Sequence, residues 1–229
     1  GVNKMETRNL SVLIPAYNEA ERIVSTITSL KLIPELKEIV VIDDGSNDET
    51  GFLAEKAGAK VIRLEKNRGK GAALNIGANY ISGQYVALID GDLGDTAQEI
   101  KKLLMPIING QADITIAIFP PASKKGGVGI VKKVSSYGLK KITKNFFHAP
   151  LSGQRVMSIE VFRELLPLSS GFGVEVGMTI DAIHKGYRIL EVKTKMGHAE
   201  TGRTWSDFRH RGIQLKDIII TFAHKAKVR

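Results

Sequence analysis

The chain has 229 residues, of which 43% are hydrophobic, and it carries a formal net charge of +9. This length and composition suit one large α/β domain, and no apolar run approaches the roughly 20 residues needed to span a bilayer. The absence of cysteine excludes disulfides, thiolate metal sites and a cysteine nucleophile. Because residues 1–10 show no signal-peptide pattern, we expect a cytoplasmic protein.

Four short apolar runs in the first half of the chain each end in a polar, glycine-bearing segment. These runs are Leu10–Ile14, Ile39–Ile42, Lys60–Leu64 and Tyr85–Ile89. Stretches with helical periodicity lie between them, at Glu21–Leu32, Glu49–Ala57 and Gly71–Ile81. Parallel strands joined by right-handed helical crossovers end at the same edge of a sheet, so the polar segments are predicted to meet in one crevice.

The fourth apolar run is followed by Asp90-Gly91-Asp92. Two carboxylates this close cannot both be buried without a counter-charge. Mg²⁺ and Mn²⁺ are the candidates, because they take oxygen ligands and are commonly bound by one or two carboxylates together with substrate phosphates. A solvated turn is the alternative, since glycine and aspartate are both favoured in turns.

Four blocks of sequence contain the predicted strand ends and the segments that follow them. They are SVLIPAYNEAERI (Ser11–Ile23), VVIDDGSNDET (Val40–Thr50), NRGKGAALNIG (Asn67–Gly77) and LIDGDL (Leu88–Leu93). In this order and spacing they resemble family 2 nucleotide-sugar glycosyltransferases of the GT-A fold. The resemblance implies a single GT-A domain over residues 1–229, with a Rossmann-like, mostly parallel central sheet flanked by helices. Residues 10–117 would form the nucleotide-sugar-binding half, and residues 118–229 the acceptor-binding half with a C-terminal helix.

The resemblance also assigns residues to the nucleoside of the donor. Carried onto the matching positions, these residues are Pro15, Ala16, Tyr17, Glu19, Asp43 and Asp44. Carboxylates accept hydrogen bonds from a uracil-type N–H and from ribose hydroxyls. Structural roles are the alternative for these acids. Glu19 would then be a first-turn helix residue stabilised by the helix dipole, and Asp43 and Asp44 would belong to a turn or a helix cap.

Lys70 stands between Gly69 and Gly71 at the start of a predicted helix. Backbone N–H groups and a cation at this position can meet a diphosphate. The spacing is not that of a P-loop, which disfavours nucleotide hydrolysis. A lysine on a solvated turn is the alternative interpretation.

For the metal and the leaving group, the resemblance implies roles for residues from both halves. Asp92 would ligate the metal, while Asp90, with Gly91 beside it, would bond the donor sugar or support the metal through water. His198 would add a ligand from the second half, and Arg203 would close over the phosphates. Imidazole suits Mn²⁺ better than Mg²⁺. A lone histidine is also compatible with a purely structural role.

The second half contains PLSGQR (Pro150–Arg155) and GFGVEVGMTID (Gly171–Asp181), followed by His198. This arrangement is similar to that of glucosyl-3-phosphoglycerate synthases. The similarity implies an acceptor site in the second half of the chain.

Four residues of these segments are assigned to the acceptor, namely Gly153, Gln154, Arg155 and Glu175. Glu175 would act as a general base or anchor an acceptor hydroxyl, with Asp90 as the other catalytic candidate. As a first-turn helix residue, Glu175 is also explained by the helix dipole. Arg155 suits a carboxylate or phosphate, although an ion pair within the fold is the alternative.

We therefore expect a metal-dependent hexosyltransferase that uses a UDP-sugar and Mn²⁺ or Mg²⁺. The expected transfer moves glucose from UDP-glucose to a small anionic acceptor such as a phosphoglycerate. A polyprenyl-phosphate sugar transferase and a non-catalytic nucleotide-sugar-binding protein are the alternatives. A nucleotidyltransferase is disfavoured, because Pro15–Glu19 stands where such enzymes carry a glycine-rich triphosphate loop.

The C-terminal segment Ile213–Phe222 alternates apolar residues with charges, and the basic tail Lys225–Arg229 follows it. A basic C-terminal helix of this kind fits peripheral contact with the inner face of a membrane, but packing against the core is favoured, since a globular helix needs an apolar face. Nucleic acid is not expected as a partner, because no nucleic-acid motif is present. A homodimer is compatible with the sequence.

Overall fold

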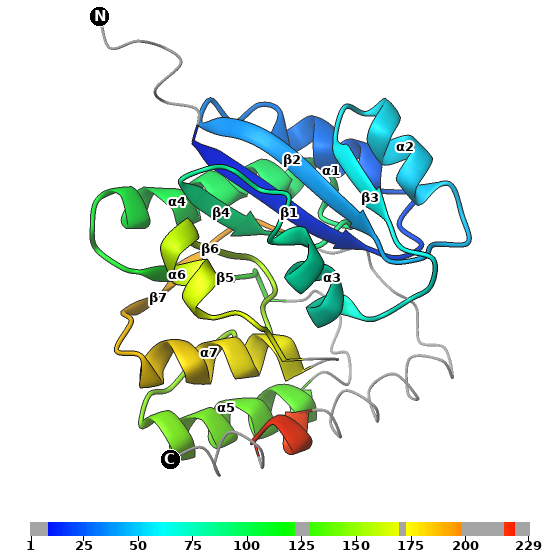
Figure 1. Cartoon of the computed structure of the whole chain (residues 1–229). Coiled ribbons are helices and arrows are strands. Elements are labelled where there is room, and N and C mark those ends of the chain that lie inside the picture. The colour runs from blue at the N-terminus through cyan, green and yellow to red at the C-terminus, as the bar shows by residue number, and fades with distance from the viewer. Residues whose placement is uncertain (1–8, 122–128, 170–172, 198–217, 223–229) are drawn as a thin grey trace, which may run out of the picture.

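The computed structural model describes residues 9–121, 129–169, 173–197 and 218–222. Its strands are β1 (Leu10–Ala16), β2 (Leu36–Asp43), β3 (Lys60–Arg63), β4 (Tyr85–Leu88), β5 (Ile114–Ile118), β6 (Arg155–Ser158) and β7 (Ile189–Lys193). Within the described residues they form one seven-stranded sheet in the order β3-β2-β1-β4-β6-β5-β7 (Figure 1). Only β6 runs antiparallel to its neighbours β4 and β5, so the sheet is mostly parallel, as predicted.

The helices of the described residues alternate with the strands in the first half of the chain. They are α1 (Ile23–Leu30), α2 (Thr50–Lys56), α3 (Lys70–Gly77), the 3₁₀ helix η1 (Gly94–Ile100), α4 (Lys101–Ile108), α5 (Gly129–Thr143), α6 (Ile159–Glu164) and α7 (Val174–His184). The predicted order of four strands and three helices is confirmed. The predicted helix over Gly71–Ile81 is wrong at its end, because α3 stops at Gly77.

β1 extends two residues beyond its predicted end and includes Pro15. Proline cannot donate a backbone hydrogen bond, and within sheets it is confined to positions where no donor is needed. β4 pairs with β1 only as far as Leu13, whereas the pairing with β2 continues to Ala16. Pro15 therefore lies where β1 has a strand partner on one side only.

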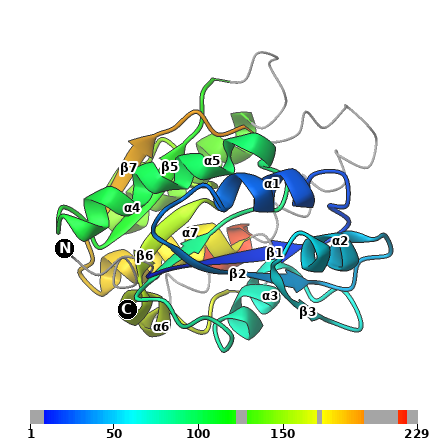
Figure 2. The same cartoon turned by 90° about the horizontal axis from the view of Figure 1, so that it is seen from above.

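Alternate side chains of β1 enter two separate hydrophobic cores, because successive residues of a strand point to opposite faces. Val12 and Ile14 pack with Ile27 of α1 in one core cluster. Leu13 packs with Leu74 of α3 in the other. Figure 2 shows α1 and α3 on opposite sides of β2. The sheet is thus covered on both faces, as parallel sheets require.

A further layer lies outside α7, where α5 packs against it (Figure 1). Leu139 of α5 and Val176 of α7 belong to a third core cluster, which also contains Ile218. Ile218 is buried and Phe222 packs against the same cluster, so the described part of the C-terminal segment lies on the core. Residues 213–217 and the basic tail lie outside the described residues. None of the helices that the structure describes has the length and apolar character that crossing a bilayer demands.

The packing of α3 on the sheet depends on Gly77. A Cβ at this position would collide with the Leu13 side chain and lie 3.1 Å from Ile42 Cγ1. We expect Gly77→Val to lower the free energy of unfolding by about 1–3 kcal/mol, as overpacking of a filled core does. Urea unfolding measures the change. A Cβ on Gly197 would meet nothing within 4 Å, so Gly197→Ala is the control. Equal stability of the two variants would contradict this account of α3.

Candidate active site

The carboxyl ends of β1, β2 and β4 meet at one edge of the sheet, as the order of strands and helices predicts. Asp44 N–H, just past β2, donates to Ala16 O at 2.8 Å, and Ile89 N–H, just past β4, donates to Leu13 O at 3.1 Å. Three of the segments assigned to the donor therefore leave the sheet side by side. Tyr17 is 43% exposed here, whereas Ala16 is buried.

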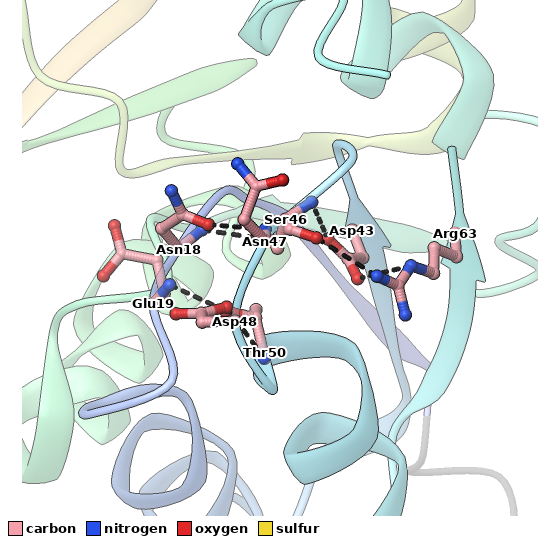
Figure 3. Close-up of polar contacts among 8 residues, drawn as sticks. All are labelled: Asn18, Glu19, Asp43, Ser46, Asn47, Asp48, Thr50 and Arg63. Carbon is pink, nitrogen blue, oxygen red and sulfur yellow. Dashed lines mark hydrogen bonds and ion pairs between the residues drawn. The ribbon is translucent and has the colours of Figure 1, made fainter. Parts of the chain in front are cut away.

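Hydrogen bonds join the turn after β1 to the turn after β2 (Figure 3). Asn18 N–H donates to Ser46 Oγ at 3.0 Å, and Asn47 N–H donates to Asn18 Oδ1 at 2.9 Å. Asn18 has φ of 56°, a left-handed conformation that asparagine tolerates better than most residues. The two turns are therefore fixed to each other by side-chain contacts.

The backbone of Glu19 is fixed by the start of α2. Glu19 N–H donates to Thr50 Oγ1 at 2.8 Å, and Asp48 accepts from Ala20 N–H and Thr50 N–H at 3.2 and 3.0 Å. Burial acts to raise the pKa of Asp48, but the hydrogen bonds from Thr50 outweigh it and hold this pKa below its ordinary value. A Cβ on Gly91 would lie 3.3 Å from Glu19 Cγ, so the Glu19 side chain lies against the Asp-Gly-Asp turn.

Asp44 organises the loop that leads into α3. Its Oδ1 accepts from Arg68 N–H and its Oδ2 from Gly69 N–H, both at 2.8 Å. A carboxylate that accepts from the backbone N–H groups of two successive residues fixes the direction of the chain at that point. Asp44 thereby places Lys70, the first residue of α3, at the edge of the site.

Asp43 is fully buried at the end of β2. Its Oδ1 accepts from Ser46 N–H at 2.9 Å, and its Oδ2 lies 3.6 Å from Arg63 Nε (Figure 3). Both predicted aspartates therefore lie at the expected strand end, and both have structural contacts there. Their binding of a nucleoside stays a prediction.

Lys70 joins the two predicted catalytic acids. Its Nζ lies 2.6 Å from Asp90 Oδ1 and 2.8 Å from Glu175 Oε1. Asp90 follows β4 and Glu175 lies in the first turn of α7, so the lysine bridges the two halves of the chain. Burial acts to lower the pKa of Lys70, but the two carboxylates outweigh it and raise this pKa above the ordinary value. Lys70 is thus held between two carboxylates, and these contacts contradict the alternative of a lysine on a solvated turn.

Gln154 holds the other side of Asp90. Asp90 N–H donates to Gln154 Oε1 at 3.1 Å, and Gln154 Nε2 donates to Asp90 Oδ2 at 2.8 Å. Gln154 is fully buried, and both the oxygen and the nitrogen of its side-chain amide are bonded to Asp90. With Lys70 on Oδ1, both oxygens of the Asp90 carboxylate are fixed in direction. Sequence reasoning assigned Gln154 to the acceptor and did not find this contact.

Arg155, the first residue of β6, lies beneath Glu175 rather than at the surface. Its Nε donates to Ser152 O at 3.1 Å, and one terminal nitrogen donates to Thr179 Oγ1 at 3.0 Å. Thr179 in turn donates to Glu175 O at 2.9 Å. Burial lowers the pKa of Arg155 to about 10, against the opposing charges of Glu175 and Glu191. Arg155 thus supports the first turn of α7 from inside the fold.

Gly153 faces the bridging lysine. A Cβ at this position would collide with Lys70 Nζ and lie 3.1 Å from both carboxylate oxygens of Asp90. A side chain at this position would displace the Lys70 ammonium from its contact with Asp90. The predicted acceptor segment therefore adjoins the predicted donor residues, although Gly153 has no side chain to offer an acceptor.

The Asp-Gly-Asp turn is fixed by Thr26 of α1. Thr26 Oγ1 donates to Gly91 O and accepts from Gly94 N–H, both at 2.8 Å. Asp92, on the same turn, is half-buried. Among the described residues, no group of three His, Cys, Asp or Glu side chains could hold a metal ion. A carboxylate on a fixed turn fits a cation that takes other ligands from donor phosphates and water.

Two predicted site residues, His198 and Arg203, lie outside the described residues, as does Gly171 at the start of the second acceptor segment. The described part of the chain brings together Lys70, Asp90, Gly153, Gln154 and Glu175. Glu19 and Gly91 form a second contact beside them.

The fold and this site define a family. A sequence model of glycosyl transferase family 2 matches residues 11–165, and the chain belongs to this family. It is 31% identical over 191 residues to glycosyltransferase AglJ of Haloferax volcanii, which covers 80% of this chain and 61% of AglJ. It is 29% identical over 194 residues to the glucosyl-3-phosphoglycerate synthase of Mycolicibacterium smegmatis, which covers 76% of this chain and 64% of that protein. The chain therefore spans less than two thirds of the length of these two relatives.

The structure is also similar to that of glucosyl-3-phosphoglycerate synthase from Mycobacterium tuberculosis in complex with Mn²⁺, UDP-glucose and phosphoglyceric acid. The TM-score is 0.80 at 27% sequence identity, and the match covers 97% of this chain and 81% of that chain. The predicted family and the predicted GT-A fold class are confirmed.

The Lys70 bridge predicts a pH-dependent contribution to stability. The folded-state pKa of Lys70 is raised above the ordinary 10.5, so the bridge stabilises the fold below that pH and is lost as the pH rises through the folded-state value. We expect Lys70→Met to be less stable than the unmodified chain at neutral pH. We expect this difference to shrink as the pH rises above 10.5.

Urea unfolding at a series of pH values measures the difference. Lys66→Met, which removes an exposed lysine of the neighbouring loop, is the matched control. A Lys70→Met deficit that stays constant at alkaline pH would show that the bridge makes no charge contribution.

Proposed function

We propose that the chain transfers glucose from UDP-glucose to a small anionic acceptor of the phosphoglycerate type, with Mn²⁺ or Mg²⁺. The observation that carries this proposal is the Lys70–Asp90–Glu175 cluster, with distances of 2.6 and 2.8 Å, at the carboxyl edge of a family 2 fold. In this cluster the lysine that we assign to the diphosphate contacts the acids that we assign to the donor sugar and to the acceptor. The complexes of the similar mycobacterial synthase support the choice of donor, metal and acceptor.

The donor would lie along the edge formed by β1, β2 and β4. Tyr17 and the two strand-end aspartates would border the nucleoside, and Lys70 would meet the diphosphate. When bound, the divalent cation would neutralise the charge that develops on the leaving diphosphate. Asp92 would hold this cation, with His198 as the ligand expected from beyond the described residues.

Asp90 would then face the donor sugar. Both of its oxygens are directed by Lys70 and Gln154, so the carboxylate is fixed before any sugar binds. Such preorganisation avoids the cost of orienting a polar group during the reaction. Gln154 is proposed as a positioning residue for Asp90 rather than as a contact of the acceptor.

Glu175 would receive the acceptor hydroxyl. It is mostly buried, and Arg155 and Thr179 fix the helical turn that carries it. A carboxylate beside the bridging lysine can accept a hydrogen bond from a hydroxyl and orient its oxygen toward the donor sugar.

Removal of the proposed metal ligand is the first test. Saturating UDP-glucose and Mn²⁺, at about 100 times the dissociation constant, should stabilise the chain by about 2.7 kcal/mol. We expect Asp92→Ala to abolish the Mn²⁺-dependent part of this stabilisation and to leave the melting temperature of the free chain nearly unchanged. Thermal unfolding with and without ligands measures both quantities.

The control for Asp92→Ala is Asp95→Ala, which removes an exposed carboxylate three residues further along. This control should keep the full ligand shift. If Asp92→Ala kept it as well, the assignment of the metal to this turn would be wrong. If the unmodified chain showed no shift with any nucleotide sugar, the proposed donor class would be wrong.

Glu175→Gln tests the acceptor step. The amide keeps an oxygen close to Lys70 but cannot take a proton, so kcat for transfer to 3-phosphoglycerate should fall by about 10²–10⁴-fold. The dissociation constant for UDP-glucose should change little, because the role of Glu175 belongs to the acceptor. Steady-state kinetics and donor titrations separate the two effects.

Glu160→Gln, in the first turn of α6, is the matched control for Glu175→Gln. It makes the same chemical change at an exposed helix start. Unchanged transfer by Glu175→Gln would leave this glutamate with structural roles only, at the start of α7 and in the ion pair with Lys70.

A further inference from the structure

One long segment of the second half carries positive charge without any acid. Between Asp113 and Glu160 the sequence contains no aspartate or glutamate, whereas lysines recur along it. The lysines of this segment whose side chains are described are Lys133, Lys140, Lys141 and Lys144, and all four are exposed. They lie on α5 and the turn that follows it, in the layer farthest from the sheet (Figure 1).

Two large aromatic side chains are exposed among these lysines. Tyr137 is 72% exposed and Phe146 is 58% exposed, and the Phe146 ring meets the His148 ring edge to face at 5.0 Å. Lys133, Tyr137 and Lys140 follow one another at helical spacing and so share one face of α5. We call Lys133, Tyr137, Lys140 and Phe146 the α5 surface. Together with His148 they line a hollow of about 520 Å³.

The α5 surface is held in place from beneath. Phe147 is buried against the third core cluster, and Ser136 Oγ donates to Phe147 O at 2.9 Å. His148 N–H and Ala149 N–H donate to the Glu191 carboxylate at 2.9 and 2.6 Å. Glu191 belongs to β7, so these two hydrogen bonds attach the turn after α5 to the edge of the sheet. The exposure of Phe146 therefore follows from a fixed turn, in which its neighbour Phe147 takes the buried position.

We propose that the α5 surface binds the surface of an anionic lipid bilayer. Exposed aromatic rings enter the region between headgroups and acyl chains, and lysines beside them reach outward to lipid phosphates. Clustered lysines with no intervening acid are attracted to an anionic leaflet. The sequence also fits membrane contact through the C-terminal helix, but Ile218 and Phe222 of that helix pack on the core.

Charge favours a bilayer over a second copy of the chain as the occupant. A symmetric contact through the α5 surface would bring Lys133 and Lys140 against the lysines of the other copy. The hollow is lined by aromatic rings and lysine stems, which suit a lipid interface. The proposal goes beyond sugar transfer, because none of its residues belongs to the donor or acceptor site.

Flotation of the full chain with vesicles tests the proposal. Vesicles of phosphatidylcholine with phosphatidylglycerol should bind the chain, and binding should fall with added salt or with phosphatidylcholine alone. The double variant Lys133→Gln, Lys140→Gln should lose about 30-fold in partition coefficient, since each lysine near an anionic surface contributes about fivefold. The double variant Tyr137→Ser, Phe146→Ser should lose about tenfold at unchanged charge.

Two matched variants complete the flotation experiment. Lys56→Gln with Lys66→Gln removes the same charge elsewhere on the surface, and Ile219→Ser with Ile220→Ser removes exposed apolar residues of the C-terminal helix. Both should bind vesicles as the unmodified chain does. All variants change exposed side chains, and their melting temperatures check the fold.

Four results would overturn the proposal. The first is that the chain does not bind anionic vesicles, and the second is that the charge-matched control loses as much vesicle binding as the Lys133 and Lys140 variant. The third is that only the Ile219 and Ile220 variant loses vesicle binding. The fourth is that the chain does not bind vesicles but sediments as a dimer, which the aromatic variant disrupts. Binding to a single-stranded oligonucleotide in place of vesicles would equally refute a lipid partner. Transfer activity in solution is measured separately, so failure of vesicle binding is distinguishable from failure of the proposed function.

Discussion

The ion bridge from Lys70 to Asp90 and Glu175 is the interaction on which the rest of the site depends. Two carboxylates from distant parts of the chain share one cation in a partly buried position. Removal of one partner from such a group leaves a charge without compensation, which costs far more than the group itself contributes to stability. The surrounding residues are consistent with this constraint: Asp44 places the lysine, Gly153 leaves room for it, and Gln154 and Arg155 fix the acids on either side.

The contacts of the site are of two kinds. The turns after β1 and β2 are joined by side chains that accept from backbone N–H groups, in which Asn18 accepts from Asn47, Asp48 from Ala20 and Thr50 from Glu19. The Lys70 bridge instead joins side chains that the sheet brings together from three elements. The first kind shapes a border for a ligand, and the second sets charges at the point where a reaction would occur.

The strand ends that border the site can be predicted from the sequence, whereas the contacts between side chains of separate elements cannot. The strand ends of β1, β2 and β4 follow from apolar runs and right-handed crossovers, so Asp44 and Asp90 could be placed at one edge. The contact of Gln154 with Asp90 depends on β6 lying antiparallel beside β4, with Arg155 opposite Leu88. No periodicity within residues 150–160 specifies that neighbour. Gln154 and Arg155 are likewise buried in the fold, although their polar side chains led to the prediction that they face an acceptor.

The insertion of β6 between β4 and β5 also has a mechanical consequence. Backbone hydrogen bonds of a single sheet connect the strand that leads to Asp90 with the strand that begins at Arg155. Rotation of one half of the molecule about a hinge would have to break this ladder. Any closure over the proposed site would therefore come from chain segments beyond the sheet, while the backbone at the ends of β4 and β6 keeps its spacing.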